Sequence, residues 1–334
     1  MLLIFALGAS FGAILKYASL NKFNTISGLA LLENFAVIKA IALAIGVGIL
    51  LLNITVGLGY ASFHIKPFFA IGLIIGGLIF GSGMAILGYC PGTLAISCGE
   101  GSTDAFLGIA GGLTGGLFYT MAQPSIQPLM GSNLGSMSLN TTLGSGTQYY
   151  VISSLIAIGF IGITVWLQKI DKTKGRKWIA AGIALAFLNA FIFSEFGASR
   201  PIGASTSFPY IADFLTGFTE NAYFSKIEKS GSWQIVFLAG AFFSAMIYSF
   251  IKKDFEIKLI HENWKRFKGN SSLKRIVWSL IGGFILIFGA RIAGGCTSGH
   301  ILSGGMQLAY SSLFFAVFTF AGLLLTGKLF YRTS

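Results

Sequence analysis

Charge is scarce in this sequence. Only 10% of its 334 residues are Asp, Glu, Lys or Arg, whereas 54% are hydrophobic. A soluble domain of ordinary composition carries about 25% charged residues, because its surface must face water. The composition therefore excludes a soluble globular protein and indicates an integral membrane protein, with the lipid bilayer as its surroundings.

Cysteine is scarce as well. The chain has three, Cys90, Cys98 and Cys296. An odd number of thiols in an apolar chain does not fit a disulfide framework. The sequence contains no Cys-x-x-Cys pair, no methionine cluster and no histidine-rich loop. We therefore expect no cofactor and no metal site, and we interpret Cys98 as a small buried apolar residue.

Long apolar runs, in contrast, are abundant. Each is close to the ~20 residues that a helix needs to cross about 30 Å of hydrocarbon, which predicts an all-α membrane protein. The first run starts at Met1 without a basic segment, and we interpret it as a retained span rather than a signal peptide. The nine predicted spans are 1–19, 36–58, 68–88, 104–122, 147–167, 178–197, 233–251, 276–293 and 308–327.

The net charge of +12 is concentrated in a few loops. Segments 168–177 and 252–275, with Lys328 and Arg332, hold 15 of the 23 Lys and Arg residues. The positive-inside rule makes these segments cytoplasmic, so nine spans place the N-terminus outside and the C-terminus in the cytoplasm of an inner or plasma membrane protein. Segment 123–146, which must then lie outside, has no charged residue. The basic excess thus follows membrane orientation and does not indicate nucleic-acid binding.

The two halves of the chain match at an offset of 206 residues. Four spans in residues 1–122 would then correspond to four in 178–327, with 147–167 as a linking helix inside one transporter domain. The span before Cys90 and the span before Cys296 run in opposite directions, so the repeats are inverted. Inverted repeats characteristically hold a substrate site near the membrane midplane. The matched pairs are Gly76 and Gly282, Gly77 and Gly283, Gly83 and Gly289, Gly88 and Gly294, Cys90 and Cys296, Ser97 and Ser303, and Gly99 and Gly305.

Two matched motifs carry the paired cysteines just after an apolar helix. Glycine and proline end those helices, and the stretches that follow, 94–99 and 301–306, are too short to cross the membrane. We expect two re-entrant hairpins that line a path, whose short helices direct free N–H groups toward an anion. The motifs are Gly88-Tyr89-Cys90-Pro91-Gly92-Thr93 and Gly294-Gly295-Cys296-Thr297-Ser298-Gly299-His300.

The chemistry of a thiol suits a soft anion. A neutral S–H group is a weak donor, and its sulfur is polarizable. Such groups can guide a sulfur-containing anion without holding it as firmly as Lys or Arg. The residues predicted to line the path are Cys90, Thr93, Arg291, Cys296, Thr297, Ser298 and His300.

Several charged or polar residues have more than one interpretation. Arg291, inside a span, is a cavity-facing anion attractor, the partner of a carboxylate or a side chain reaching to the outer interface. His300 donates to the substrate or is a packed histidine. Glu195 and Arg200 form a local ion pair or attract the incoming anion. Glu100 and Asp104 would repel a dianion, although Asp104 can also cap a helix.

At these motifs the chain resembles the YeeE/YedE family of sulfur-transport membrane proteins, whose characterised members take up thiosulfate. The resemblance covers most of the chain and is particularly close over residues 291–300. It implies an hourglass-shaped transporter with a thin central barrier, a thiosulfate relay through Cys90 and Cys296, and a cytoplasmic sulfur-carrier partner. The family's further cysteine near the first re-entrant loop has no counterpart in residues 22–28, where Asn24, Thr25 or Ser27 would have to substitute.

The sequence thus predicts a transporter, not an enzyme, that takes up thiosulfate or a related small sulfur anion. Two other function classes stay open. One is a membrane thiol oxidoreductase or sulfurtransferase that forms a persulfide on cysteine. The other is a soft-metal transporter that uses Cys90, Cys296 and His300 as ligands.

Overall fold

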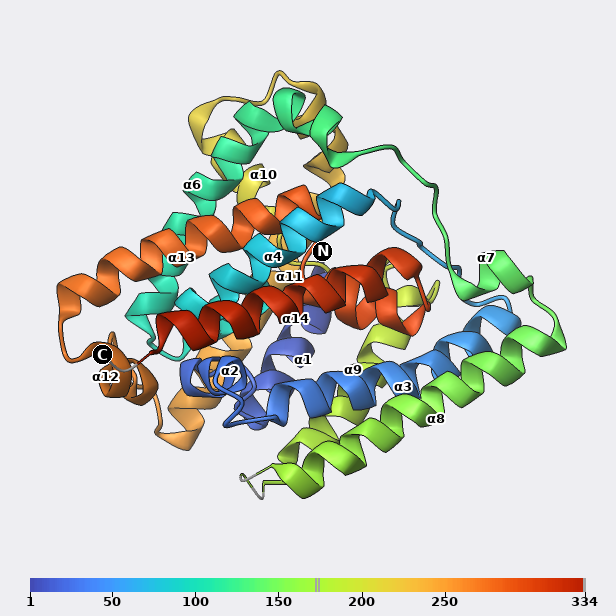
Figure 1. Cartoon of the computed structure of the whole chain (residues 1–334), viewed down its shortest axis with the longest axis horizontal. Coiled ribbons are helices and arrows are strands. Elements are labelled where there is room, and N and C mark those ends of the chain that lie inside the picture. The colour runs from blue at the N-terminus through green and yellow to red at the C-terminus, as the bar shows by residue number, and fades with distance from the viewer. Residues whose placement is uncertain (172, 174, 333–334) are drawn as a thin grey trace.

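The computed structural model describes residues 1–171, 173 and 175–332. Lys172 and Lys174, two of the basic residues assigned above to a cytoplasmic segment, lie outside the described residues. Over the described part, the chain is built of helices joined by loops, and its β-type contacts are isolated bridges such as that between Phe69 and Asn133 (Figure 1). The predicted all-helical class is confirmed.

Every one of the nine predicted spans is helical. Within the described ranges, seven helices are long and apolar enough to cross a membrane, while α1 and α9 have only 16 and 17 residues. α11 begins 11 residues before the predicted start at 233 and so takes in part of the expected loop. The nine are α1 (Leu2–Tyr17), α3 (Ala36–Gly57), α4 (Ala70–Leu87), α6 (Thr103–Ile126), α8 (Thr147–Ile170), α9 (Lys177–Phe193), α11 (Ala222–Lys252), α13 (Ser272–Ile292) and α14 (Tyr310–Phe330).

Short helices fill the interior between these long ones. At about 1.5 Å per residue, helices of eight to ten residues are far too short to cross the bilayer. Those in the interior are α2 (Phe23–Ala30), α5 (Pro91–Gly99) and the π-helix η2 (Thr297–Gly304), whereas α10 (Ser207–Thr216) is buried only over its first part and exposes Phe214 and Leu215. The remaining short elements are η1 (Gln127–Met130), α7 (Leu139–Leu143) and α12 (Glu262–Lys268).

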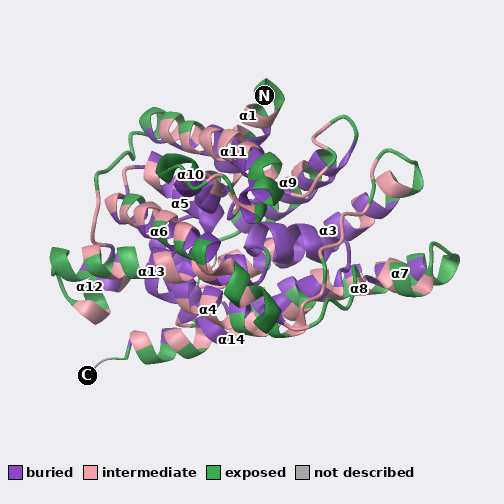
Figure 2. Ribbon diagram, turned by 90° about the horizontal axis from the view of Figure 1, so that it is seen from above, coloured by how far each residue is buried: buried purple, intermediate pink, exposed green. Residues whose placement is uncertain are grey.

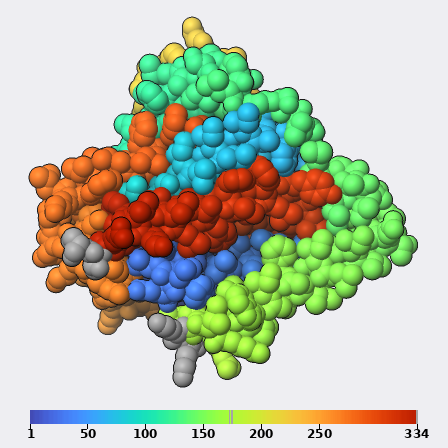
Figure 3. Space-filling model, viewed as in Figure 1, coloured from blue at the N-terminus to red at the C-terminus, as the bar shows by residue number. Residues whose placement is uncertain are grey.

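The long helices pack in two groups. α4 lies against both α13 and α14, and α13 also packs along α6. α1 packs on α11, and α3 lies between α8 and α9. α14 crosses one face of the molecule between α4 and the segment holding α2 (Figure 3). Buried residues concentrate along the middle of the bundle, whereas α7, α8 and α12 form much of its exposed margin (Figure 2).

The two ends of the bundle are distinct. α12 and the C-terminus lie at one end, and α7 lies at the opposite end (Figure 1). At the α12 end, the buried Lys16 of α1 forms ion pairs with Asp254 and Glu100. At the α7 end, Phe68 exchanges backbone hydrogen bonds with the segment around Gly135. Loops distant in the sequence therefore close each end of the bundle.

Candidate functional site

The two cysteine loops have the same backbone geometry. Gly88 and Gly294 both have left-handed backbones, with φ of +80° and +75°. Two residues later, Cys90 and Cys296 are extended and directly precede α5 and η2. A left-handed residue followed by an extended one turns the chain out of α4 or α13 and into a short helix. The helix ends predicted at these motifs are confirmed.

Cys90 is fixed by the first turn of α5. Its backbone N–H donates to Thr93 Oγ1 at 2.8 Å, and the Thr93 backbone N–H faces the Cys90 sulfur in a capping-box arrangement. Pro91 occupies the first helical position, where its missing N–H costs nothing, and Gly92 follows it. The Cys90 side chain is only partly buried. The helix therefore holds this thiol at its N-terminus with one side open.

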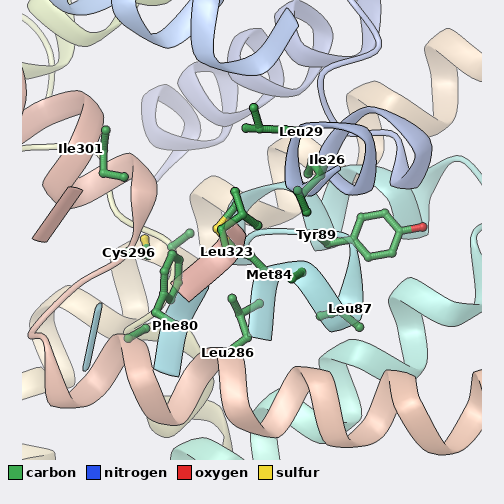
Figure 4. Close-up of a cluster of buried hydrophobic side chains, with 14 of the residues drawn as sticks. Ile26, Leu29, Phe80, Met84, Leu87, Tyr89, Leu286, Cys296, Ile301 and Leu323 are labelled. Carbon is green, nitrogen blue, oxygen red and sulfur yellow. The ribbon is translucent and has the colours of Figure 1, made fainter. Parts of the chain in front are cut away.

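Cys296 is almost completely buried, at 1% exposure. Figure 4 shows its sulfur among apolar side chains that include Phe80. Its polar neighbour is Ser298, whose Oγ lies 3.7 Å from the sulfur. The second thiol therefore lies in a drier setting than Cys90.

A small cavity of about 60 Å³ connects the two loops. Cys90 and Thr93 line it from α5, and Thr297 and Ser298 line it from η2. The Thr297 hydroxyl is buried and has no hydrogen-bond partner in the described part of the chain. An unpaired buried hydroxyl is costly unless something else binds it. The rest of the lining is largely apolar and includes Phe11, Leu15, Leu20, Ile26 and Met84.

Two larger cavities lie on the other side of the Cys296 loop, with volumes of about 780 and 220 Å³. Both are lined by Lys66, Lys226, Arg291 and Gly294, and we call them together the cationic vestibule. Arg200 and Lys229 add two more cations to the larger cavity. All charged side chains among its described lining residues are basic. Such a surface raises the local concentration of anions.

Arg291 lines both cavities of this vestibule. It is 8% exposed and donates to the hydroxyls of Tyr223 at 2.8 Å, Thr206 at 3.0 Å and Ser205 at 3.2 Å. These partners are neutral, so within the described residues its charge is not paired with a carboxylate. Of the interpretations given above, the cavity-facing one matches this geometry.

His300 is held on both sides of its ring. Nδ1 lies 3.2 Å from the Ser312 hydroxyl, and Nε2 lies 3.0 Å from the carbonyl of Ala293. A carbonyl only accepts, so Nε2 carries the proton, and in the neutral ring Nδ1 accepts from the Ser312 hydroxyl. The packed interpretation therefore matches the structure, although the ring still borders the smaller vestibule cavity.

Lys66 was missed by the sequence reasoning. It comes from the loop before α4, and its ammonium donates to the carbonyl of Gly294 at 2.9 Å. The Lys66 side chain is half-buried. Partial loss of water around its ammonium, together with the positive charge of Arg291, lowers the pKa of Lys66 to about 8, against an opposing effect of Cys296. The only signal in the sequence was a single lysine in a loop expected outside.

The acidic residues beside the first hairpin are neutralised. Glu100 is bound by Lys16, Lys22 and the amide of Asn21. Asp104 is completely buried against Arg275 and His261. The predicted repulsion of a dianion by these carboxylates is therefore offset by neighbouring cations.

Of the remaining predicted residues, Arg200 belongs to the larger vestibule cavity and Cys98 lies elsewhere. Arg200 donates to the carbonyl of Lys229 and the hydroxyl of Ser230, so the alternative of an ion pair with Glu195 does not match the structure. Burial lowers the pKa of the Arg200 guanidinium. Cys98 is only partly buried, so the prediction of a buried residue is wrong, and it borders a separate apolar groove near the far end of α5.

Comparison with known proteins decides the family. The model of a family described as sulphur transport matches residues 23–325, which is nearly the whole chain. The chain belongs to this sulphur-transport family. It is also similar to the thiosulfate transporter TsuA of Spirochaeta thermophila, with 23% identity over 334 residues that cover 94% of each chain. The resemblance to the YeeE/YedE family is thereby confirmed, and the protein is a multi-pass membrane protein of sulfur transport.

Proposed function

We propose that this protein takes up thiosulfate, or a closely related small sulfur anion, into the cytoplasm. The observation that carries the proposal is the cationic vestibule, whose described charged residues are all basic and which reaches Gly294 in the Cys296 loop. The relative TsuA is named a thiosulfate transporter, which supports the same substrate class. Transport without enzymatic conversion fits both observations.

The path would pass through neutral groups once the anion leaves the vestibule. Cys296 and Ser298 lie beyond Gly294, and Thr297 and Cys90 line the small cavity on the other side. A hydrogen bond to a charged partner contributes about 1.5–3 kcal/mol, enough to guide a dianion while still releasing it. The unpaired hydroxyl of Thr297 would gain a partner whenever the anion passes.

Helix pairing supports the inverted repeat with its two re-entrant hairpins. The offset of 206 residues relates α4, α5 and α6 to α13, η2 and α14. α4 of the first half packs on α14 of the second, and their counterparts α13 and α6 pack on each other in the same way. The pair of α1 and α11 likewise corresponds to the pair of α9 and α3. Such exchanged pairing is what a pseudo-two-fold axis between two halves produces. In the proposed topology all nine helices span, the α7 end faces outside and the α12 end faces the cytoplasm.

Growth and uptake test the proposal. Cells that cannot otherwise take up thiosulfate should grow on it as the sulfur source when they express this protein. Cys90→Ala and Cys296→Ala should each abolish growth and the uptake of radiolabelled thiosulfate into proteoliposomes. Cys98→Ala, at a thiol outside the path, should leave both intact. Unchanged uptake after replacement of both path cysteines would refute the relay.

The other function classes make different predictions. A soft-metal site would need a free imidazole nitrogen at His300, and both nitrogens are engaged. A persulfide-forming enzyme would accumulate a modified cysteine during turnover, which mass spectrometry of the purified protein would detect. A sulfur-carrier partner at the α12 end remains a prediction that co-purification can test.

A further inference from the structure

We propose that the ammonium group of Lys66 binds the incoming anion in the cationic vestibule and delivers it to Cys296, so that high-affinity uptake requires Lys66 to be protonated. This inference rests on the proposed transport function and adds to it the residue that receives the substrate. It also makes the transporter with a neutral Lys66 a low-affinity form.

The position of Lys66 is the first observation. It lies in both vestibule cavities and reaches across from the loop before α4 to the carbonyl of Gly294. Its Nζ occupies the space that a side chain at Gly295 would fill, and it lies beside Gly299 as well. Because these two residues have no side chain, the ammonium can come close to the loop that holds Cys296. Lys66 therefore lies between the vestibule and the buried thiol.

Its free hydrogen-bonding capacity is the second observation. A lysine ammonium has three N–H donors, and within the described residues that of Lys66 makes one hydrogen bond, to a neutral carbonyl. An anion competes well with the carbonyl of Gly294, because it brings a full negative charge to the ammonium, whereas the carbonyl offers only a dipole. An arriving dianion can thus use the two free donors and replace the third bond. Loss of that bond to Gly294 would also release the loop that leads to Cys296.

The surroundings of Lys66 lower its pKa enough for the ammonium to lose its proton within a pH range that an uptake assay can cover. The groups that face it are Arg291 from α13, Lys226 from α11, His300 from η2 and the thiol of Cys296. Two of these are cations, and His300 is neutral in the hydrogen-bonded state described above. The positive charge of protonated Lys66 therefore has little negative charge nearby to stabilise it. With a pKa of about 8, Lys66 is charged at pH 7 and largely neutral above pH 9. Thiosulfate is a dianion throughout this range, so a change in uptake would report on the protein.

The test measures the KM and maximal rate of thiosulfate uptake into proteoliposomes between pH 6 and 9.5. Wild type should show a rise in KM of about 10-fold for each pH unit above 8, because the competent fraction falls by that factor. Lys66→Arg, which stays charged, should take up thiosulfate without this alkaline rise. Lys66→Met should have a KM raised at least about 10-fold at pH 7 and independent of pH. Lys226→Met removes a cation that lines the same cavities and should keep the alkaline rise.

Two results would overturn the inference. One is a Lys66→Met variant with the wild-type KM and pH profile. The other is an alkaline rise that persists in Lys66→Arg. Thermal unfolding in detergent, with and without thiosulfate, separates a folding defect from lost binding, since a folded Lys66→Met protein should keep its Tm but lose the ligand-induced increase. A wild-type protein that takes up no thiosulfate at any pH would instead refute the transport proposal, and this inference with it.

Discussion

The Arg275 guanidinium binds the Asp104 carboxylate through two hydrogen bonds, at 2.5 and 3.2 Å, although the residues lie 171 positions apart. Neither side chain is exposed. Arg275 also donates to the carbonyls of Ile86 and Leu87 at the end of α4, immediately before the Cys90 loop. The pair therefore joins α6 and α13 to the turn that positions the first path cysteine.

Asp104→Asn should destabilise the protein strongly. The change leaves the buried charge of Arg275 without its counter-charge, and breaking a buried pair in this way typically costs about 3–5 kcal/mol. Thermal unfolding in detergent should show a clearly lower Tm. The exposed pair between Arg266 and Glu33 provides the control, because Glu33→Gln should cost at most about 1 kcal/mol. Equal effects of the two substitutions would contradict this account.

Thr297→Val should separate transport from stability. The Thr297 hydroxyl is buried without a partner in the described structure, so its removal should leave the Tm unchanged or slightly higher. Thiosulfate uptake should nevertheless fall several-fold, since the anion loses a hydrogen-bond partner in the small cavity. Thr319→Val removes a similar unpaired hydroxyl from α14 and should leave uptake at the wild-type rate. Normal uptake by Thr297→Val would show that this hydroxyl does not contact the anion during transport.

Gly88→Ala should be more harmful than Gly294→Ala. A left-handed backbone costs a residue with a side chain about 1–2 kcal/mol, and this applies at both positions. Only at Gly88 would the added methyl group also overlap a neighbour, the ring of Phe23, whereas Gly294 has open space at this point. The Tm and the uptake rate should both decrease more for Gly88→Ala. A larger loss for Gly294→Ala would show that the overlap with Phe23 does not decide which of the two loops is more sensitive to an added methyl group.

Asp171 should make stability depend on acidic pH. Burial acts to raise the pKa of its carboxyl, but hydrogen bonds from Lys39 at 2.5 Å and from Thr173 outweigh burial and lower the pKa below its ordinary value. A lowered pKa in the folded state contributes stability above the unfolded value near pH 4, and this stability is lost as pH falls through the folded value. Asp171→Asn should lower the Tm at pH 7 and flatten its decrease between pH 5 and 3. An unchanged pH profile would contradict the assignment.

Local sequence patterns were sufficient to predict the positions of the helices and of the two cysteine loops. The length of an apolar run depends only on neighbouring residues, and all nine predicted spans are helical. The matched motifs around Cys90 and Cys296 likewise predicted the helix ends, whereas the left-handed backbones of Gly88 and Gly294 were not predicted. The bounds were less accurate where α11 continues into a polar segment, because its first turns are stabilised by contacts with α10.

Long-range contacts account for what the sequence did not reveal. Lys66 and Gly294 are 228 residues apart, and no local pattern relates the loop before α4 to the Cys296 loop. The same applies to Glu100 and Asp104, whose cationic partners come from α1, the loop before α2 and α13. Only the packed bundle shows which charges compensate one another.

The small cavity between the cysteine loops has a bioenergetic consequence. Most of its lining is apolar, and at about 60 Å³ it offers few polar partners for ordered water. Protons cross membranes through proteins by hopping along hydrogen-bonded water, and the apolar side chains of Phe11, Leu15, Leu20 and Ile26, which line the cavity together with Cys90, would interrupt such a chain. A cell expressing this transporter would therefore keep its proton-motive force while no anion occupies the proposed path.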